Sequence, residues 1–269
     1  MTRLVQCRAA LLAGLLALAP AALAETGDCA PGPAQAGGTV ERVIDGETLL
    51  LKSGAEVLLI NAAAPRRDAG LAEQARLELA ALIGDEPVTL SFGGRRQDRY
   101  GRLLAHVFAG TGENALWVQG EMVGRGLAVA YSFRDNRACM GALLARESAA
   151  RKARRGVWTS LEYAVRAADR PESLSGLTDS FQIVEGEVIS TGATGQRVYL
   201  NFGRRWKTDF TGIIASKDLD LFASGGILPL KLPRRRVRLR GWLAEHDGPL
   251  MTLDHPEQIE LIDDDERTD

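Results

Sequence analysis

The sequence predicts a protein of the α+β class, mainly β, with two small domains in succession. Two observations support this prediction. Short β-rich runs bounded by Gly, Asn, Asp or Pro turns occur in both halves of the chain, and apolar residues at helical spacing occur between them in the first half. About 245 residues remain after an expected N-terminal leader, and this length suffices for two domains.

The N-terminus has the composition of a secretory signal peptide. Arg3 and Arg8 accompany an apolar run at residues 9–19, and Ala22-Leu23-Ala24 forms a small-x-small cleavage signal. The run is shorter than the roughly 20 residues that a bilayer-spanning helix needs, and no later segment is long and apolar enough to span a membrane. We expect cleavage after Ala24 and a periplasmic or secreted protein, with an uncleaved anchor as the alternative.

Two cysteines, Cys29 and Cys139, remain after this leader is removed. Cys29 lies five residues past the cleavage signal, which is too far for lipid modification. In an oxidising compartment two lone cysteines favour a disulfide, with two unrelated thiols as the alternative. The bridge would close a loop of about 110 residues and stabilise the fold by ~4–5 kcal/mol in the chain-entropy model.

The formal charge of −2 excludes neither nucleic acid nor protein as a partner, because a nucleic-acid-binding protein needs only a local basic surface. The three histidines, His106, His246 and His255, lack the spacing of a zinc site. The basic loop at 95–102 carries Tyr100 and suits a phosphate backbone, with an ordinary solvated loop as the alternative. The cations at 151–155 close a helix and complement its dipole.

The first domain is expected over residues 38–160, after a flexible Gly- and Pro-rich lead-in at 25–37. A turn at Asp45-Gly46 divides its first β-rich segment, and the charged loop at 93–101 joins two later strands. The expected strands span 40–51 (with the turn), 56–61, 88–92 and 103–108, and the expected helices span 71–83, 116–125 and 142–155.

The second domain is expected over residues 181–262, after a linker at 161–180 and before an acidic tail at 263–269. The run of strands ends in a hairpin whose first strand reads Arg236–Trp242, and the pattern looks like a small OB-type β-barrel. Its expected strands span 183–190, 197–202, 208–215, 237–244, 250–253 and 259–262.

Several motifs in the first domain resemble the thermonuclease, or staphylococcal nuclease-like, family. They are Val43-Ile44-Asp45-Gly46-Glu47-Thr48, Asp98-Arg99-Tyr100-Gly101-Arg102, Gly126-Leu127-Ala128 and a terminal helix that ends at Gly156-Val157-Trp158. Each motif alone is weak, but their order and spacing are specific, and the resemblance covers about half of the chain. It implies a five-stranded OB barrel with three helices, descended from Ca²⁺-dependent nucleases that cut DNA or RNA.

The resemblance assigns six retained positions. Glu47 occupies the first metal-ligand position, where the family prefers Asp, and Thr48 and Arg102 match a catalytic Thr and a phosphate-binding Arg. Substrate-side groups match Arg99 and Tyr100, and Tyr131 stands where a substrate-stacking Tyr is expected.

Three catalytic positions of the family are lost. Leu58 stands where a phosphate-binding Arg belongs, and Ala63 stands where the second metal carboxylate belongs. Arg66 replaces the acidic residue that acts on water, which reverses the charge. Since Ca²⁺ requires six to eight oxygen ligands, these losses predict little or no cleavage, with Asp68, Glu73 and Asn61 as remote substitutes.

The second domain offers a weaker candidate surface. Arg and aromatic residues alternate on its predicted strands and suit stacking of single-stranded nucleic acid, with a solvated sheet face as the alternative. The candidate residues are Arg204, Arg205, Trp206, Arg238 and Arg240.

Three functional hypotheses follow from the sequence. The first is an exported pseudoenzyme that binds single-stranded nucleic acid or another ligand on the old cleft. The second is a working Ca²⁺-dependent nuclease with a rebuilt site, and the third is an envelope scaffold for protein partners. No cofactor is expected, except Ca²⁺ if the nuclease site works.

Overall fold

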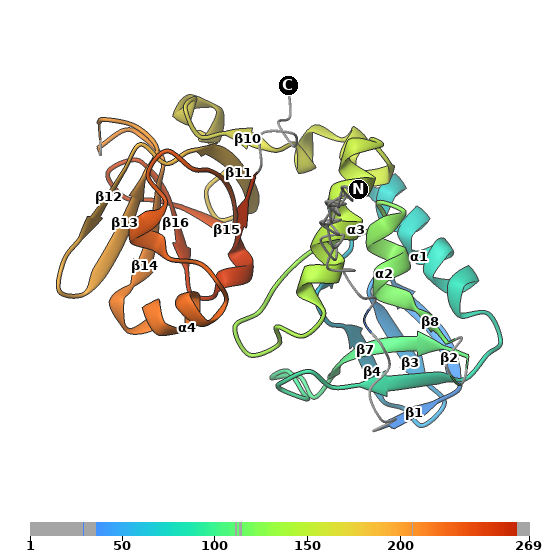
Figure 1. The fold of residues 1–269 in the computed structure, drawn as a ribbon. Coiled ribbons are helices and arrows are strands. Elements are labelled where there is room, and N and C mark those ends of the chain that lie inside the picture. The colour runs from blue at the N-terminus through green and yellow to red at the C-terminus, as the bar shows by residue number, and fades with distance from the viewer. Residues whose placement is uncertain (1–28, 30–35, 111, 113–114, 206, 263–269) are drawn as a thin grey trace, which may run out of the picture.

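The computed structural model describes Cys29 and residues 36–262, apart from 111, 113–114 and 206. The expected leader, most of the lead-in and the acidic tail lie outside the described residues. The described chain forms two domains, each built on a curved β-sheet (Figure 1). Within these ranges, no helix combines the length and the apolar character that crossing a bilayer requires.

The two end strands of the sheet in the first domain, β1 (Ala36–Gly38) and β2 (Val40–Asp45), are consecutive in the chain. The other strands of this sheet are β3 (Thr48–Leu51), β4 (Glu56–Leu59), β6 (Val88–Ser91), β7 (Leu103–Ala109) and β8 (Leu116–Trp117). The order is β1-β6-β7-β4-β3-β2, with β8 beside β7; the β4–β7 pair is parallel and the others are antiparallel. Only Thr39 separates β1 from β2, so one stretch of chain forms both ends of the order. Two short strands, β5 (Ala62–Ala63) and β9 (Val129–Ala130), pair separately.

Three α-helices, α1 (Ala69–Ile83), α2 (Val118–Gly124) and α3 (Met140–Lys152), cover this sheet. The Asp68 side chain caps α1 by accepting a hydrogen bond from the Leu71 amide at 3.0 Å. The sequence predicted one helix over 116–125, but Leu116 and Trp117 pair with β7 as β8 and the helix begins at Val118. Residues 116–117 form a strand and not the first turn of the helix, because Trp117 pairs with Phe108 of β7.

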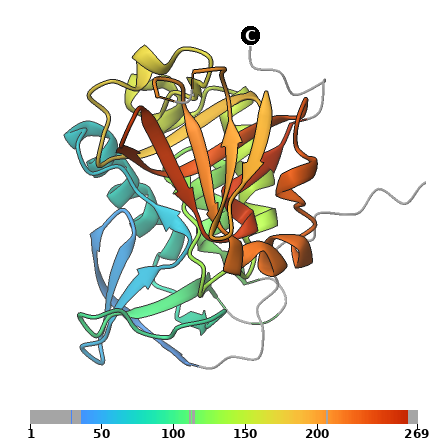
Figure 2. The same cartoon turned by 90° about the vertical axis from the view of Figure 1, so that its left-hand side faces the viewer.

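The sheet of the second domain follows the same plan. Its strands are β10 (Arg166–Ala167), β11 (Phe181–Glu187), β12 (Ser190–Ala193), β13 (Arg197–Asn201), β14 (Thr211–Ala215), β15 (Arg236–Glu245), β16 (Pro249–Leu253) and β17 (Ile259–Leu261), with α4 (Leu219–Ser224) between β14 and β15. The order is β10-β11-β15-β16-β14-β13-β12, and β17 pairs with β15. The strands β12, β13, β14 and β16 fan out on the left-hand face of the molecule (Figure 2).

The two sheets share one topology. In each sheet, a short break divides the first stretch of chain into two parts. The part before the break pairs with the fourth strand, and the part after the break pairs with the second strand. A helix joins the third strand to the fourth, and the third and fifth strands (β4 and β7, or β14 and β16) form a parallel pair. The second domain therefore repeats the strand plan of the first.

The segment between the domains has structure of its own. β10 adds a parallel strand beside β11, and Ala168 and Leu174 are buried in the core of the second domain. Part of the segment between residues 161 and 180 therefore packs against the sheet of the second domain.

The domains meet at a set of buried charges, here named the interdomain charge cluster. Arg240 of β15 donates to Glu147 of α3 at 2.8 Å and to the Ala130 carbonyl at 2.9 Å, and both charged side chains are fully buried. Burial lowers the pKa of Arg240, but the charges of Glu147 and Glu260 outweigh it and the net shift is upward. The cluster comprises Glu147, Arg151, Glu185, Arg238, Arg240 and Glu260.

Other polar contacts also join the two domains. Arg137 pairs with Glu257 at 2.8 Å, and Arg134 pairs with Asp218 at 2.8 Å. The two domains are therefore held against each other by several specific interactions, not by the covalent connection alone.

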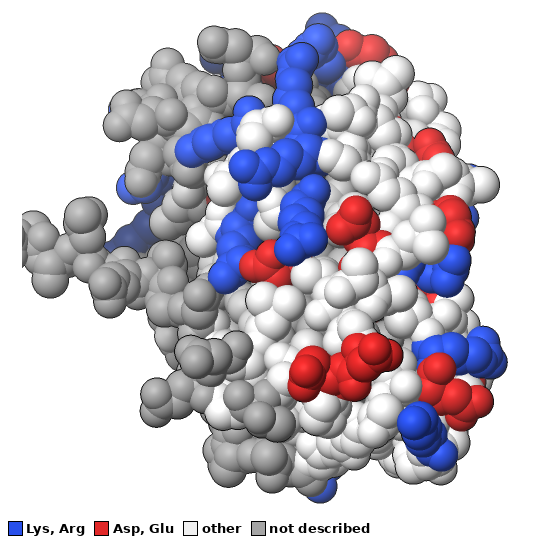
Figure 3. Space-filling model, turned by 90° about the vertical axis from the view of Figure 1, so that its right-hand side faces the viewer, with Lys and Arg blue, Asp and Glu red and all other residues white. Residues whose placement is uncertain are grey.

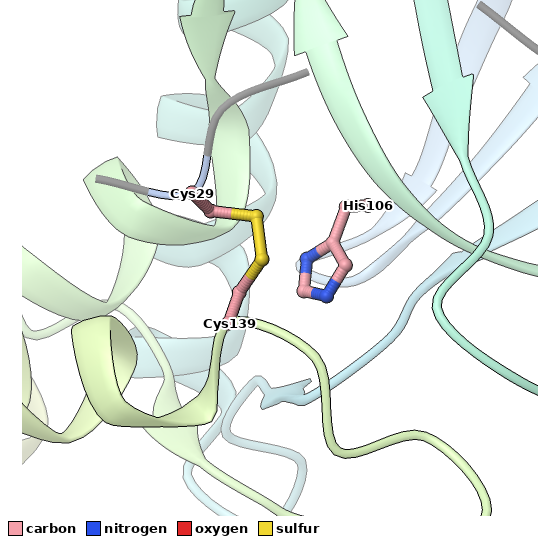
Figure 4. A group of neighbouring side chains, drawn as sticks. All are labelled: Cys29, His106 and Cys139. Carbon is pink, nitrogen blue, oxygen red and sulfur yellow. A yellow bond between two sulfur atoms is a disulfide. The ribbon is translucent and has the colours of Figure 1, made fainter. Parts of the chain in front are cut away.

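The Cys29–Cys139 disulfide is present, as the sequence predicts. It fixes the start of the described chain to the N-terminus of α3 and lies beside His106 (Figure 4).

Candidate functional site

Glu47 lies at the centre of the candidate site. It follows the tight turn at Asp45-Gly46, where the Asp45 carboxylate accepts from the Glu47 amide at 2.9 Å. Gly46 is required there, because a Cβ atom would lie 2.7 Å from the Cβ of Ala64 and 2.8 Å from that of Ala75. Glu47 is only 5% exposed as a residue, and its carboxylate accepts from the Ala64 amide at 2.6 Å through Oε2.

Arg66 takes the other oxygen of this carboxylate. Its guanidinium donates to Glu47 Oε1 and forms an ion pair with it, although most of the Arg66 side chain is exposed. The hydrogen bond to Glu47 raises the pKa of Arg66, and the opposite charge adds to this effect. Both oxygens of the first expected metal ligand therefore have partners from the protein itself.

The residues present do not fit a Ca²⁺ site of the kind that the sequence resemblance implies. Ca²⁺ is held by six to eight oxygen atoms, but Ala63 offers no side-chain oxygen and Arg66 places a cation at the carboxylate. Among the described residues, only Cys29, His106 and Cys139 gather three potential metal-ligand atoms within 4.8 Å.

A cavity of about 430 Å³ opens beside Glu47, between the two domains. The first domain contributes four of the positions assigned from the sequence besides Glu47, and the second domain contributes the opposite wall. The four positions are Leu58, Ala63, Arg66 and Tyr131, and the opposite wall includes Asp179, Phe181, Gln182 and Trp242. Five of the nine positions that the sequence resemblance assigns therefore line one cavity.

Aromatic side chains from both domains meet in this cavity. The Tyr131 ring lies 4.9 Å from the Phe133 ring and 4.9 Å from the Phe181 ring, between centroids. Trp242 Nε1 donates to the Tyr131 hydroxyl at 2.6 Å, and Trp242 remains 57% exposed. The second domain therefore supplies a large part of the aromatic surface.

Asn61 also lines the cavity and has a strained backbone. Its φ of 67° lies in the left-handed region, and its side-chain amide donates to the Ala138 carbonyl at 3.1 Å. Its Oδ1 is buried and has no hydrogen-bond partner within the described ranges. The Thr48 hydroxyl is likewise buried without a partner there, but Thr48 does not line the cavity.

The loop residues Arg99, Tyr100 and Arg102 do not line the cavity. Asp98 organises their loop by accepting from the Tyr100 and Arg102 amides and from Arg102 Nε at 2.7 Å. Burial acts to raise the pKa of Asp98, but these hydrogen bonds outweigh it and the pKa is lowered. The Arg99 guanidinium lies 4.7 Å from the centre of the exposed Tyr100 ring.

The two expected substitute acids, Asp68 and Glu73, have other partners. Asp68 is engaged as the cap of α1, and Glu73 pairs with Arg76 on the exposed surface of that helix at 2.6 Å. Neither lines the cavity.

In the second domain, Arg238 and Arg240 differ from the expected solvent-facing platform. Both belong to the interdomain charge cluster and are 1% exposed, because β15 pairs with β11 and β17 along one domain and packs against α3 of the other. Arg204 and Arg205 are exposed in the loop after β13. Trp206 lies outside the described residues.

The cysteine–histidine group does not form a metal site as it stands, because the two sulfur atoms are bonded to each other (Figure 4). Burial lowers the pKa of His106 to about 4. Its Nδ1 accepts from Trp117 Nε1 at 3.3 Å, and its Nε2 lies 3.2 Å from the Ala138 carbonyl. The neutral imidazole satisfies both contacts.

Positive charge also gathers away from the cavity, in a band on the right-hand face of the molecule (Figure 3). The exposed cations at the ends of α2 and α3 are Arg125, Lys152, Arg154 and Arg155. Arg125 and Arg146 share the carboxylate of Glu121 at 3.2 Å. This pairing offsets part of the positive charge.

Sequence reasoning missed the contribution of the second domain to the cavity. Phe181 and Trp242 are separated from Tyr131 by 50 and 111 positions along the chain, and no local motif connects them. Only the structure shows that Trp242 is exposed on a strand where its neighbours, Gly241 and Leu243, are buried.

Comparisons with known proteins found a family match within the first domain. Residues 56–160 match a family described as staphylococcal nuclease homologue. A protein named Protein ParB, from Escherichia coli, is 34% identical over 149 residues, which cover 52% of this chain and 82% of that relative. Two proteins named Uncharacterized endonuclease, from Escherichia coli O157:H7 and Escherichia coli, are each 29% identical over 128 residues, which cover 46% of this chain and 78% of the relative.

Proposed function

Because this chain belongs to the staphylococcal nuclease homologues, we propose that its interdomain cavity binds single-stranded DNA or RNA without cleaving it. The observation that carries the proposal is the pairing of Glu47 with Arg66. The sequence retains a carboxylate at the family's first metal position, but a protein cation replaces the metal as its partner.

Loss of cleavage follows from the chemistry of the cavity wall. A positioned acid or base contributes about 10²–10⁴-fold to a rate, and loss of a transition-state stabiliser costs about 10²–10³-fold. Leu58 provides no guanidinium, Ala63 provides no metal ligand, and Arg66 provides no base. The effects are not additive, but together they remove the groups that metal-assisted hydrolysis requires.

Retention of binding is supported by the aromatic surface. Tyr131, Phe181 and Trp242 present ring faces or edges to one cavity, and base–aromatic stacking contributes about 1–3 kcal/mol per base. Arg66 and Arg67, exposed where they line the cavity, suit a phosphate.

Two further parts of the proposal concern architecture and location. The shared strand plan, with a parallel pair of third and fifth strands, supports an OB-type barrel for both domains. The Cys29–Cys139 disulfide supports export to an oxidising compartment, which agrees with the leader expected from the sequence.

The test uses the exported form, residues 25–269, with fluorescein-labelled single-stranded DNA and RNA, in Ca²⁺ and in EDTA. Anisotropy should report binding that is independent of Ca²⁺, and gels should show intact oligonucleotide. Trp242→Ala should weaken binding, whereas Trp242→Phe, which keeps an aromatic face, should preserve most of it.

Two other results would replace this proposal. Ca²⁺-dependent cleavage that is lost in Glu47→Ala would establish the nuclease with a rebuilt site, which the endonuclease relatives make the second candidate. Neither binding nor cleavage would favour the envelope scaffold with a protein partner.

A further inference from the structure

A second groove lies entirely within the C-terminal domain. It encloses about 250 Å³ and is lined by Arg197, Tyr199 and Asn201 of β13, by Thr211 and Ile213 of β14, and by residues 246–250. It shares no lining residue with the interdomain cavity. The family model covers residues 56–160 and does not extend to it.

The groove arises from the alternation of β13. Val198 and Leu200 point into the core, so Arg197, Tyr199 and Asn201 face outward on the same side of the strand. Across the ladder, Tyr199 is opposite Ile213 and Asn201 is opposite Thr211. An aromatic ring, a guanidinium and an amide therefore follow one another along an outer face of the sheet.

The position of the groove corresponds to that of candidate site residues in the first domain. It lies on the second, third and fifth strands, at the loop that joins the fourth strand to the fifth. In the first domain, Leu58 of the interdomain cavity lies on the third strand, and the basic loop with Arg99 and Tyr100 joins the fourth strand to the fifth. OB-type barrels bind oligonucleotides on this face.

A basic loop borders the groove. Arg204, Arg205 and Lys207 are exposed in the connection between β13 and β14. A Cβ atom at Gly248, in the groove, would lie 3.2 Å from the Lys207 carbonyl oxygen, so the loop and the groove are adjacent. With Arg197, four cations lie in or beside the groove; Asp209, which accepts from the Arg205 amide, and Asp247 are the nearby acids.

We propose that this groove is a second binding site for single-stranded nucleic acid. A base stacks on Tyr199, and the phosphate backbone follows Arg197 and the loop between β13 and β14. Stacking on an aromatic ring beside a positively charged groove is the general chemistry of single-strand recognition. The groove goes beyond the proposed function of the interdomain cavity and does not depend on it.

The test measures anisotropy with labelled oligo-dT and oligo-U of about 8 and about 30 nucleotides, on the exported form and its variants. Tyr199→Ala should weaken binding of the short strand about 5- to 150-fold, whereas Tyr199→Phe should leave it nearly unchanged. Arg197→Gln should reduce the slope of log affinity against log salt by about 0.7, as expected for one lost phosphate contact.

Ultraviolet crosslinking locates the bound strand independently of affinity. Crosslinks to 4-thiouridine in oligo-U should map to the tryptic peptide Val198–Arg204. Circular dichroism of each variant confirms the fold, and Arg76→Gln, on the surface of α1, serves as the charge control.

The outcomes separate the two sites. Binding that persists in Tyr131→Ala/Trp242→Ala and disappears on adding Tyr199→Ala supports the groove. Equal affinities of Tyr199→Ala and Tyr199→Phe, with crosslinks only in the interdomain cavity, would overturn the groove and leave the proposed function standing. Loss of all binding in Tyr199→Ala alone would support the groove and overturn the cavity.

Discussion

At the scale of single residues, Arg66 pairs with Glu47, the carboxylate that the sequence resemblance assigns to the first metal-ligand position. The carboxylate keeps its place after the turn and its hydrogen bond to the Ala64 amide, which are features of the backbone. What changes is its partner, because the next arginine along the chain reaches the free oxygen. The backbone that positions Glu47 is therefore independent of the side chain that pairs with its carboxylate.

This separation predicts that catalysis can be restored. Leu58→Arg, Ala63→Asp and Arg66→Glu together should produce Ca²⁺-dependent cleavage of single-stranded DNA, because the three restored groups line the same cavity as Glu47. Each group is expected to contribute at least about 10²-fold. Cleavage is measured on gels in Ca²⁺ and in EDTA, with the triple variant plus Glu47→Ala as the control. A folded triple variant without cleavage would count against the assignment of these positions.

His106 predicts a pH dependence of stability. Its pKa is lowered from 6.5 to about 4 by burial, so the unfolded chain binds a proton in a pH range where the folded protein does not. The stability due to the neutral ring is fully present above pH ~6.5 and decreases as the pH falls toward ~4, by up to about 3 kcal/mol.

Thermal unfolding between pH 7.5 and pH 4.5 measures this effect. His106→Gln, which keeps one acceptor and one donor, should flatten the decrease in melting temperature on acidification. His246→Gln, at a fully solvated position, should leave the pH profile unchanged. Parallel profiles for His106→Gln and the unmodified protein would show that other groups cause the decrease.

At the scale of elements, two glycines explain a pair of sequence motifs. Gly126 has a φ of 72° and Gly156 a φ of 50°, and the amide of Val157 donates to the Gly126 carbonyl at 2.8 Å. A Cβ atom at Gly126 would lie 2.2 Å from the Arg155 carbonyl oxygen. The end of α2 and the turn after α3 can meet only when neither residue has a side chain.

We therefore predict that Gly126→Ala lowers the free energy of unfolding by about 3 kcal/mol, from backbone strain and overpacking. Gly141→Ala in α3 is the matched control, because its Cβ would meet no atom within 4 Å. That control should be neutral or stabilising by up to about 1 kcal/mol. Urea unfolding measures both, and equal effects would contradict the steric explanation.

The elements also show which features a sequence can predict. Alternating apolar residues predicted the principal strands, and the turn, cap and cysteine signals are local enough to read along the chain. The start of α2 was misplaced because the pairing of Trp117 with Phe108 is a non-local contact. Arg238 and Arg240 were expected on a surface but are buried. The alternation of a strand predicts which residues share a face, but it does not predict whether another domain covers that face.

At the scale of the whole molecule, the buried arginine of β15 joins two domains that share a topology but differ in sequence. Arg240 contacts Glu147 of the first domain and Glu260 of the second. Removing one partner from a buried ionic group leaves an uncompensated charge, which costs about 3–5 kcal/mol. This group, together with the Arg134–Asp218 and Arg137–Glu257 pairs, holds the second domain and with it the far wall of the cavity. Such a contact has no local signature in the sequence, which is why the cavity could be predicted only from its first-domain side.

We predict that Arg240→Met destabilises the protein by about 3–5 kcal/mol and separates the unfolding of the two domains into two transitions. Adding Glu147→Gln should recover part of the loss, because it removes one uncompensated charge. The measurement is urea unfolding followed by tryptophan fluorescence and circular dichroism, with Arg235→Met, at an exposed position, as the control. A single unchanged transition in Arg240→Met would show that the charges do not couple the domains.

The buried charges at the domain interface also have a hydrodynamic consequence. Two domains on a flexible tether reorient independently in solution, whereas domains joined by an interdomain charge cluster rotate as one particle. Nitrogen-15 relaxation should then give one rotational correlation time for amides of both domains. The relative direction of the interdomain cavity and the groove on β13 would be set by the protein, so a strand long enough to reach both must bend to follow them.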